Sequence, residues 1–140
     1  MPSFQDFICF QMGIAARTLQ KYYNAKYSTY GLTLAQSYIL LALYEKDGLG
    51  VKGLAEHLFL DSSAVTGLID RMEKEALLER RIDPRDRRAF QISLTPKGRN
   101  LAEQILPISN DLNESMKLAL DKEEWNGVMS FVKKIQEYCK

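Results

Sequence analysis

The fold is decided by residues 61–98, which read DSSAVTGLIDRMEKEALLERRIDPRDRRAFQISLTPKG. Apolar residues recur at helical spacing in the first part of this stretch and predict an amphipathic helix. Its apolar side carries Val65, Leu68, Ile69, Met72 and Ala76. Its other side is polar and carries Ser63, Thr66, Gly67, Asp70 and Arg71. One of the residues at positions 61–63 is expected to cap the helix start, because Asp and Ser side chains accept hydrogen bonds from the first free backbone N–H groups.

Two short segments with alternating side chains follow this helix, at residues 78–82 and 89–94. The alternation predicts two β-strands and places Phe90, Ile92 and Leu94 on one face of the hairpin. Asp83 and Pro84 supply the turn between the strands, since proline suits the second position of a turn. A short helix, a turn, a second helix and a hairpin together predict a winged helix-turn-helix over residues 33–98.

Helices are expected on both sides of this region. Apolar residues at helical spacing predict a first helix from about residue 4 to 30, where Gly31 offers a stop signal. Thr33 and Gln36 form a capping box that starts a second helix, and residues 51–58 form a short third one. The fold class is therefore mainly α with a small β-hairpin.

The C-terminal part predicts two more helices. Thr95 and Pro96 read as the cap and first residue of a long helix to about residue 120, which Pro107 should kink or interrupt. Asp121 and Glu124 then cap a last helix. The apolar stripes within residues 1–30 and 100–140 have no obvious partner inside so small a domain. We therefore expect these segments to be dimerisation helices that pack against a second copy.

Length and composition place the chain in a broad class. Its 140 residues suit one ordinary domain, spanning 1–140. No apolar run approaches the ~20 residues that a membrane span needs, and no signal peptide is recognisable, so we expect a cytoplasmic protein without membrane contact. Cys9 and Cys139 are too few and too far apart for a disulfide scaffold or a metal site. The sequence predicts no metal, no cofactor and no catalytic residue.

Charge is segregated within a chain whose formal net charge is only +1. Residues 71–99 hold nine basic side chains against five acidic ones, and seven of the eight arginines of the chain lie there. A local basic stripe rich in arginine favours contact with a polyanion, because guanidinium groups form forked hydrogen bonds to phosphate and to base edges. The stripe therefore predicts binding to double-stranded DNA.

Four motifs in this order resemble the MarR family of transcription regulators: LAEHL at 54–58, DSSAVT at 61–66, DPRDRR at 83–88 and LTPKG at 94–98. The resemblance spans nearly the whole chain. It implies an obligate homodimer that binds a pseudo-palindromic operator, usually as a repressor released by a small molecule or by oxidation. A two-fold dimer would set its two recognition helices about one helical turn, ~34 Å, apart.

The family resemblance also implies which residues meet DNA. The helix beginning at Ser62 would enter the major groove, and Arg88 at the wing tip would enter the minor groove, steadied by Asp86. A guanidinium suits a narrow, electronegative minor groove, and a neighbouring carboxylate restricts its rotamers. The predicted DNA-binding residues are Ser62, Ser63, Thr66, Arg71, Arg85, Asp86 and Arg88.

The segment around Cys9 is similar to the peroxide-sensing OhrR branch of the family, in which an N-terminal cysteine is oxidised and the operator is released. Tyr23 matches one of the tyrosines that hold the thiolate across the dimer in that branch. Fourteen residues along a helix span about 21 Å, so only a partner chain running the other way would bring Tyr23 to Cys9. Two aromatic positions of the pattern are replaced here, by Leu34 and Gly13.

Other functions remain open from the sequence. Six of the seven tyrosines lie within the first two helices, where they could line a site for a small phenolic effector or form an interface or core. Small-molecule control, thiol control and no effector are all compatible with the sequence. A winged-helix module that binds proteins rather than DNA is the alternative function. An enzyme has little support, since His57 is the one histidine and no phosphate loop or nucleophile–base pair is recognisable.

Overall fold

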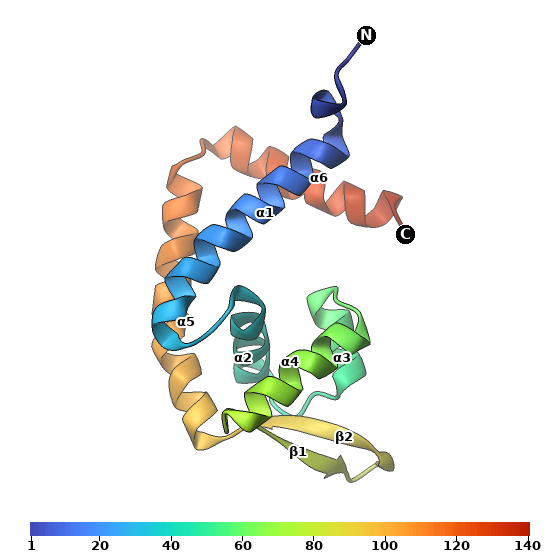
Figure 1. The fold of residues 1–140 in the computed structure, drawn as a ribbon, viewed down its shortest axis with the longest axis vertical. Helices are drawn as coiled ribbons and strands as arrows, with labels where there is room; N and C mark the ends of the chain where they lie inside the picture. Colours follow the sequence, from blue (N-terminus) through green and yellow to red (C-terminus); the bar gives the residue numbers. More distant parts are fainter. The chain divides into compact units, whose positions relative to one another are not determined.

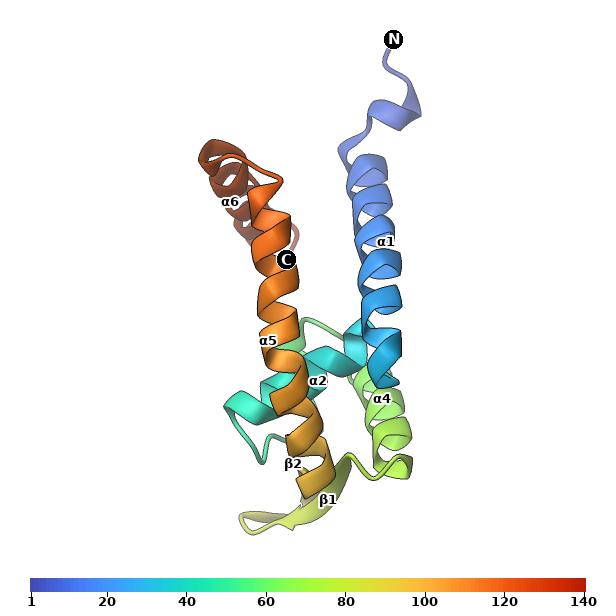
Figure 2. The ribbon, with the colours of Figure 1, turned by 90° about the vertical axis from the view of Figure 1, so that its left-hand side faces the viewer.

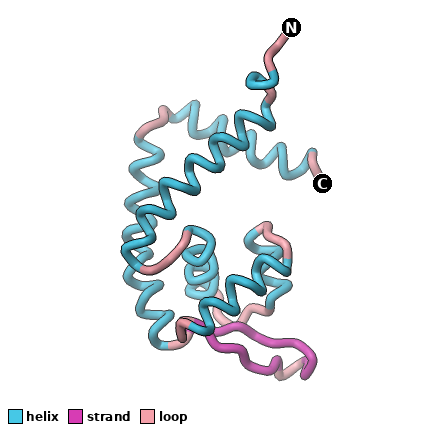
Figure 3. The backbone as a smooth tube through the Cα atoms, viewed as in Figure 1, coloured by secondary structure: helices cyan, strands magenta, loops and turns pink.

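The computed structural model describes residues 1–140 as six α-helices and one two-stranded sheet, coloured along the sequence in Figure 1 and by type in Figure 3. The chain divides into two compact units, Met1–Ile105 and Leu106–Lys140. The mainly helical fold with a small hairpin is confirmed. The elements are α1 (Ile8–Tyr27), α2 (Leu34–Glu45), α3 (Val51–Leu58), α4 (Ser62–Lys74), β1 (Leu78–Asp83), β2 (Asp86–Leu94), α5 (Pro96–Leu118) and α6 (Lys122–Tyr138).

The core of the first unit lies among α2, α4, β2 and the first part of α5. Three residues of the apolar stripe predicted for α4 are confirmed as core residues, because Val65, Ile69 and Met72 are fully buried. They are buried together with residues of the neighbouring elements, so the removal of apolar surface from water holds α4 in place. The other fully buried large side chains are Ile39, Leu40, Leu43, Leu54, Ile92 and Ile105.

The end of α4 differs from the sequence prediction. The helix stops at Lys74, and Ala76 lies beyond it, exposed and with a left-handed backbone at φ 60°. Ala76 donates its N–H to the carbonyl of Glu73, and Leu77 donates to the carbonyl of Met72. These bonds satisfy carbonyl groups that the helix end leaves free, which is why the chain turns here although alanine has high helix propensity.

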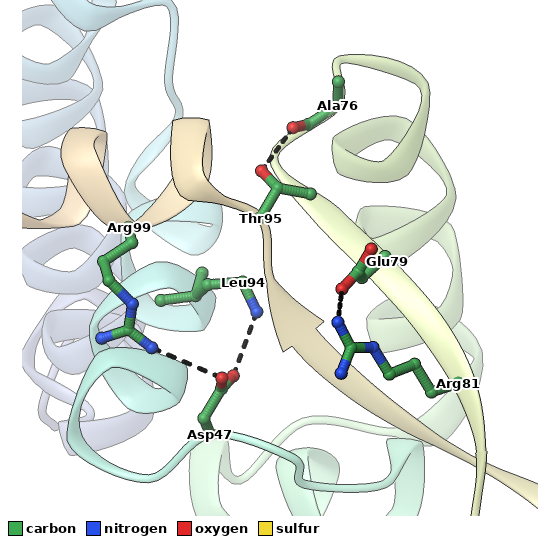
Figure 4. Close-up of polar contacts among 7 residues, drawn as sticks. All are labelled: Asp47, Ala76, Glu79, Arg81, Leu94, Thr95 and Arg99. Atoms are coloured by element: carbon green, nitrogen blue, oxygen red, sulfur yellow. Dashed lines mark hydrogen bonds and ion pairs between the residues drawn. The ribbon is translucent and has the colours of Figure 1, made fainter.

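Three consecutive carbonyl groups after α4 accept hydrogen bonds from the start of α5. The Lys97 Nζ donates to the carbonyl of Glu75 at 2.9 Å, and the Thr95 hydroxyl donates to the carbonyl of Ala76 at 2.6 Å (Figure 4). The backbone N–H of Thr95 donates to the carbonyl of Leu77 at 3.1 Å. We call these contacts, made between residues 75–77 and 95–98, the α4–α5 joint.

Asp47 makes a second connection to the same region, as Figure 4 shows. One carboxylate oxygen accepts the N–H of Leu94 at the end of β2, at 3.0 Å. The other oxygen lies 3.4 Å from the guanidinium of Arg99 on α5, which also lies over the ring of Tyr44. One side chain after α2 thus contacts both the sheet and α5.

The hairpin extends beyond the core. β1 and β2 pair antiparallel from Leu78 opposite Leu94 to Ile82 opposite Phe90, and β2 starts three residues earlier than predicted. Ile92 and Leu94 are buried as expected, but Phe90 is 50% exposed. The predicted common face therefore belongs to the core only at its inner end, because the outer residues pass beyond the helices that cover it.

The ends of the other helices test the predicted caps. Capping boxes at Thr33 with Gln36 and at Asp121 with Glu124 are confirmed. The first helix is present, but it is shorter than predicted: α1 begins at Ile8, because Phe7 has an extended backbone that separates it from a short 3-10 turn at Phe4–Asp6. Ser3 and Asp6 close that turn with their own capping box. Pro107 does not interrupt α5, which continues through it to Leu118.

Each unit exposes an apolar helix face. In the first unit, α1 contacts α2 through its C-terminal part (Figure 2). The side-chain oxygen of Asn24 there accepts the N–H of Leu34 at 2.7 Å. Tyr27 is the one buried residue of α1. The exposed apolar residues of this helix include Ile8, Met12, Ile14, Leu19 and Tyr22. In the second unit, α6 buries no residue and exposes Val128, Met129, Val132, Ile135 and Tyr138. No helix of the chain is both long and apolar enough to cross a membrane.

The α4–α5 joint leads to a stability prediction. A Cβ atom added to Gly98 would lie 2.0 Å from the Leu77 carbonyl oxygen, which is backbone and held by the joint. We expect Gly98→Ala to lower the free energy of unfolding by about 3 kcal/mol, at the upper end of overpacking costs. Ala76→Gly should raise the free energy of unfolding by about 1 kcal/mol, because glycine adopts the left-handed backbone without strain. Urea denaturation followed by circular dichroism measures both, and a neutral Gly98→Ala would contradict this account of the joint.

Candidate nucleic-acid interface

The start of α4 is held by Asp61. Its carboxylate accepts the N–H of Ala64 at 2.8 Å and the hydroxyl of Ser63 at 2.7 Å. The hydrogen bond from Ser63, followed by the one from Ala64, lowers the pKa of Asp61 below its ordinary value. The expected cap among residues 61–63 is therefore Asp61, and its carboxylate is charged at neutral pH next to the positive end of the helix dipole.

The outer face of α4 presents hydroxyl groups whose protons are already engaged. Ser63 donates to Asp61, and Thr66 donates to the carbonyl of Ser62 at 2.8 Å. All three predicted hydroxyl residues, and Arg71 as well, are exposed. Because these protons are bonded to Asp61 and to the Ser62 carbonyl, the hydroxyl oxygens of Ser63 and Thr66 face outside partners as acceptors. Such a face suits the amino groups of bases, and a threonine methyl suits the methyl group of thymine.

Arg80 joins the sheet to the outer side of α4. Its guanidinium lies 2.5 Å from Asp70 and 3.3 Å from Glu73, two carboxylates one turn apart on the helix. Each pair is partly exposed, so each stabilises the fold by at most about 1 kcal/mol. Their main effect is electrostatic, because Arg80 offsets two negative charges on a helix that would otherwise repel phosphate. Arg80 is not among the residues predicted from the sequence, although the two acids spaced i, i+3 on the helix could have indicated its partners.

The wing tip is built from two aspartates that accept backbone hydrogen bonds. Asp83 accepts the N–H of Arg85 at 2.8 Å, and Asp86 accepts the N–H of Arg88 at 3.0 Å. The Arg88 side chain is 95% exposed, and its Nε lies 3.7 Å from Asp86. The structure therefore brings Asp86 and Arg88 together and leaves the guanidinium of Arg88 accessible. Arg85 is exposed at the same turn.

Cys9 and Tyr23 are not brought together within one chain. Cys9 is an exposed thiol in the first turn of α1, and Tyr23 lies fourteen residues further along the same helix. Burial first, and then the neighbouring Tyr22 and Tyr27, raise the pKa of Tyr23. Its hydroxyl is therefore protonated at neutral pH and able to donate. Cys139, at the end of α6, is also an exposed thiol.

A cavity of about 380 Å³ lies in the first unit among α1, α2 and the end of α3. Tyr38 is the one tyrosine among the residues that line it. Burial raises the pKa of Tyr38, with smaller effects from Tyr27 and Tyr23. The other lining residues are Ala16, Leu19, Gln20, Leu34, Ala35, Leu58 and Leu60.

Comparison with known proteins places this fold in a family. Residues 30–89 match the model of the MarR family. The HTH-type transcriptional regulator SarZ of Staphylococcus aureus strain USA300 is 32% identical over 135 residues, which cover 94% of this chain and 90% of SarZ. The chain belongs to the MarR family. It is thus a transcriptional regulator with a DNA-binding winged helix.

Solved structures share the fold of this MarR-family chain. The structure of S. aureus MepR in complex with DNA superposes with a TM-score of 0.86 at 21% identity and covers all of both chains. BpsR of Bordetella bronchiseptica, whose DNA binding is regulated by 6-hydroxynicotinic acid, superposes with a TM-score of 0.86 at 23% identity over 97% of each chain. At these identities the similarity establishes the architecture of helices and wing.

Proposed function

We propose that the protein is a homodimeric repressor that binds a pseudo-palindromic operator, with α4 in the major groove and Arg88 in the minor groove of each half-site. One observation carries this proposal. The hairpin that ends in the Asp86–Arg88 pair is fixed at its base to α4, because Arg80 joins β1 to the helix. A wing anchored in this way keeps its base at a constant spacing from α4, while its tip carries the accessible guanidinium of Arg88.

The dimer rests on the apolar faces of the terminal segments. Val128, Met129 and Val132 on α6 are between 42% and 50% exposed, and Ile8 and Met12 on α1 are similarly open. Faces of this kind on a folded chain mark surfaces that another protein covers. A second copy is the natural occupant, since the two-fold symmetry of a dimer matches the symmetry of a pseudo-palindrome.

Sedimentation equilibrium at micromolar concentration tests the dimer. We expect a mass twice the 16.0 kDa of one chain. Val132→Asp should shift the equilibrium towards monomers, because it places a charge in an apolar interface. Ser130→Asp adds the same charge to an exposed position on the other side of α6 and should leave the dimer intact. A folded wild-type monomer under these conditions would rule out the two-half-site operator.

The wing proposal predicts the effect of removing one guanidinium. Arg88→Ala should weaken operator binding by about 1 to 3 kcal/mol, the size of one good directional contact. Folding should be unaffected, because the side chain is almost fully exposed. Lys46→Ala removes one exposed positive charge after α2 and controls for the loss of charge alone. Fluorescence anisotropy at matched salt measures both variants, and equal affinities for Arg88→Ala and wild type would exclude the wing from DNA recognition.

Release of the operator by a small aromatic molecule is supported by the cavity beside Tyr38. Its volume suits a ligand of one or two rings, and its lining residues are apolar apart from Tyr38 and Gln20. The residues around it belong to α1, α2, the end of α3 and the turn that leads into α4. A ligand bound there would therefore contact both a proposed dimerisation helix and the segment that leads into the recognition helix.

Release by thiol oxidation is supported by Cys9 and Tyr23. In a dimer whose α1 helices run antiparallel, the Tyr23 hydroxyl of one subunit would stabilise the thiolate of Cys9 of the other. A hydroperoxide then transfers one oxygen to the sulfur and leaves as the alcohol, and the cysteine becomes a sulfenic acid. The bulkier group would shift the terminal helices and change the spacing of the recognition helices.

Stoichiometric hydroperoxide tests this form of control. We expect it to lower operator affinity of the wild type and to leave Cys9→Ser unaffected. Tyr23→Phe should slow the oxidation, because it removes the proposed donor but keeps the ring. Mass spectrometry follows the oxidation state of Cys9. If Cys9 is oxidised while operator binding survives, control lies elsewhere.

A further inference from the structure

Gly67 lies in the middle of α4, and neither the backbone conformation nor the packing of the chain requires a glycine at this position. It is exposed, its backbone does not have a positive φ, and a Cβ atom built on it would meet nothing within 4 Å. Gly98 differs, since the Leu77 carbonyl excludes any side chain there. Glycine inside a helix is less stable than alanine because it loses more conformational freedom on folding. Gly67 therefore weakens α4 without relieving strain or crowding within the chain.

The position of Gly67 on α4 indicates what could occupy the empty space beside it. It follows Ser63 by four residues and precedes Asp70 by three, so all three share the outer face of α4. It is also the next residue after Thr66, whose hydroxyl is bonded to the helix backbone. The empty space thus lies on the side of α4 that is proposed to enter the major groove.

We propose that Gly67 is the point of closest approach between α4 and DNA, where the bare helix backbone packs against the methyl group of a thymine. This inference rests on the proposed insertion of α4 into the major groove. The backbone polar groups in mid-helix are bonded within the helix, so the surface that Gly67 presents is the hydrogens of its Cα. An apolar surface of this kind matches the thymine methyl, which is the apolar feature of the major-groove edge. A side chain at residue 67 would hold the helix away from it.

Gly67→Ala tests the proposal because it should change folding and binding in opposite directions. The probe is the duplex of about 30 base pairs that the wild-type protein enriches from a random library, long enough for two half-sites. We expect the melting temperature of the protein to rise by about 2 to 4 °C. Affinity for the duplex should fall roughly 5- to 100-fold, as for one mismatched base pair. The dependence on salt should not change, since no phosphate contact is lost.

Gly127→Ala is the matched control. Gly127 lies within α6, and a Cβ atom added there also meets nothing within 4 Å. This variant should raise the melting temperature to a similar extent and leave affinity for the duplex unchanged.

Replacing the thymines of the duplex one by one with deoxyuridine removes the methyl group alone. At the thymine that packs against Gly67, which occurs once in each half-site, the replacement should weaken binding of the wild-type protein. The same replacement should restore part of the affinity of Gly67→Ala, because it makes room for the added Cβ. If no position restores it, or if Gly67→Ala binds within about twofold of wild type, the inference is wrong. A lower melting temperature would also overturn it, by revealing a structural need for glycine.

Failure of the proposed function has a different signature. Thr66→Asp adds a negative charge on the same face and should abolish binding if α4 enters the groove, because phosphates lie on both sides of the helix. If Thr66→Asp and Arg88→Ala both bind like wild type, α4 and the wing do not meet DNA. If they lose affinity while Gly67→Ala does not, only the inference about Gly67 fails.

Discussion

The α4–α5 joint is the contact on which the rest of the first unit depends. Three successive carbonyl groups at residues 75–77 accept bonds from Thr95 and Lys97, and Gly98 allows the two backbones to meet. The end of α4 is therefore bonded directly to the start of α5, which follows the wing. Because all three acceptors are backbone carbonyl groups, α4 cannot shift without breaking several bonds together.

The wing is tied to the same body by side chains from different elements. Arg80 joins β1 to the acids of α4, and Asp47 joins the residue after α2 to β2 and Arg99. The outer end of the hairpin has no such support, and Phe90 is exposed there. A rigid base with an open tip suits the proposed role, in which Arg88 enters a narrow groove whose width varies with sequence.

The outer face of α4 reads DNA in this proposal through acceptors and shape. The hydroxyl protons of Ser63 and Thr66 are used within the helix, and Arg80 offsets the charge of Asp70. The face that remains has acceptor oxygens, a threonine methyl and a bare backbone at Gly67. Such a surface distinguishes bases by their amino and methyl groups, whereas Arg88 of the wing responds to the width and the electronegative potential of the minor groove.

The sequence by itself determined what depends on neighbours along the chain. The apolar stripe of α4, the capping boxes at Thr33 and Asp121 and the position of the hairpin follow from the pattern of residues along the chain, and the family resemblance implied the pairing of Asp86 with Arg88. Only the tertiary structure decided that Ala76 turns left-handed to meet Thr95, that Phe90 lies beyond the core, that Arg80 reaches α4 and that Tyr38 alone of the tyrosines lines the cavity. Each of these depends on contacts between segments distant in sequence, where packing and backbone pairing outweigh local propensity.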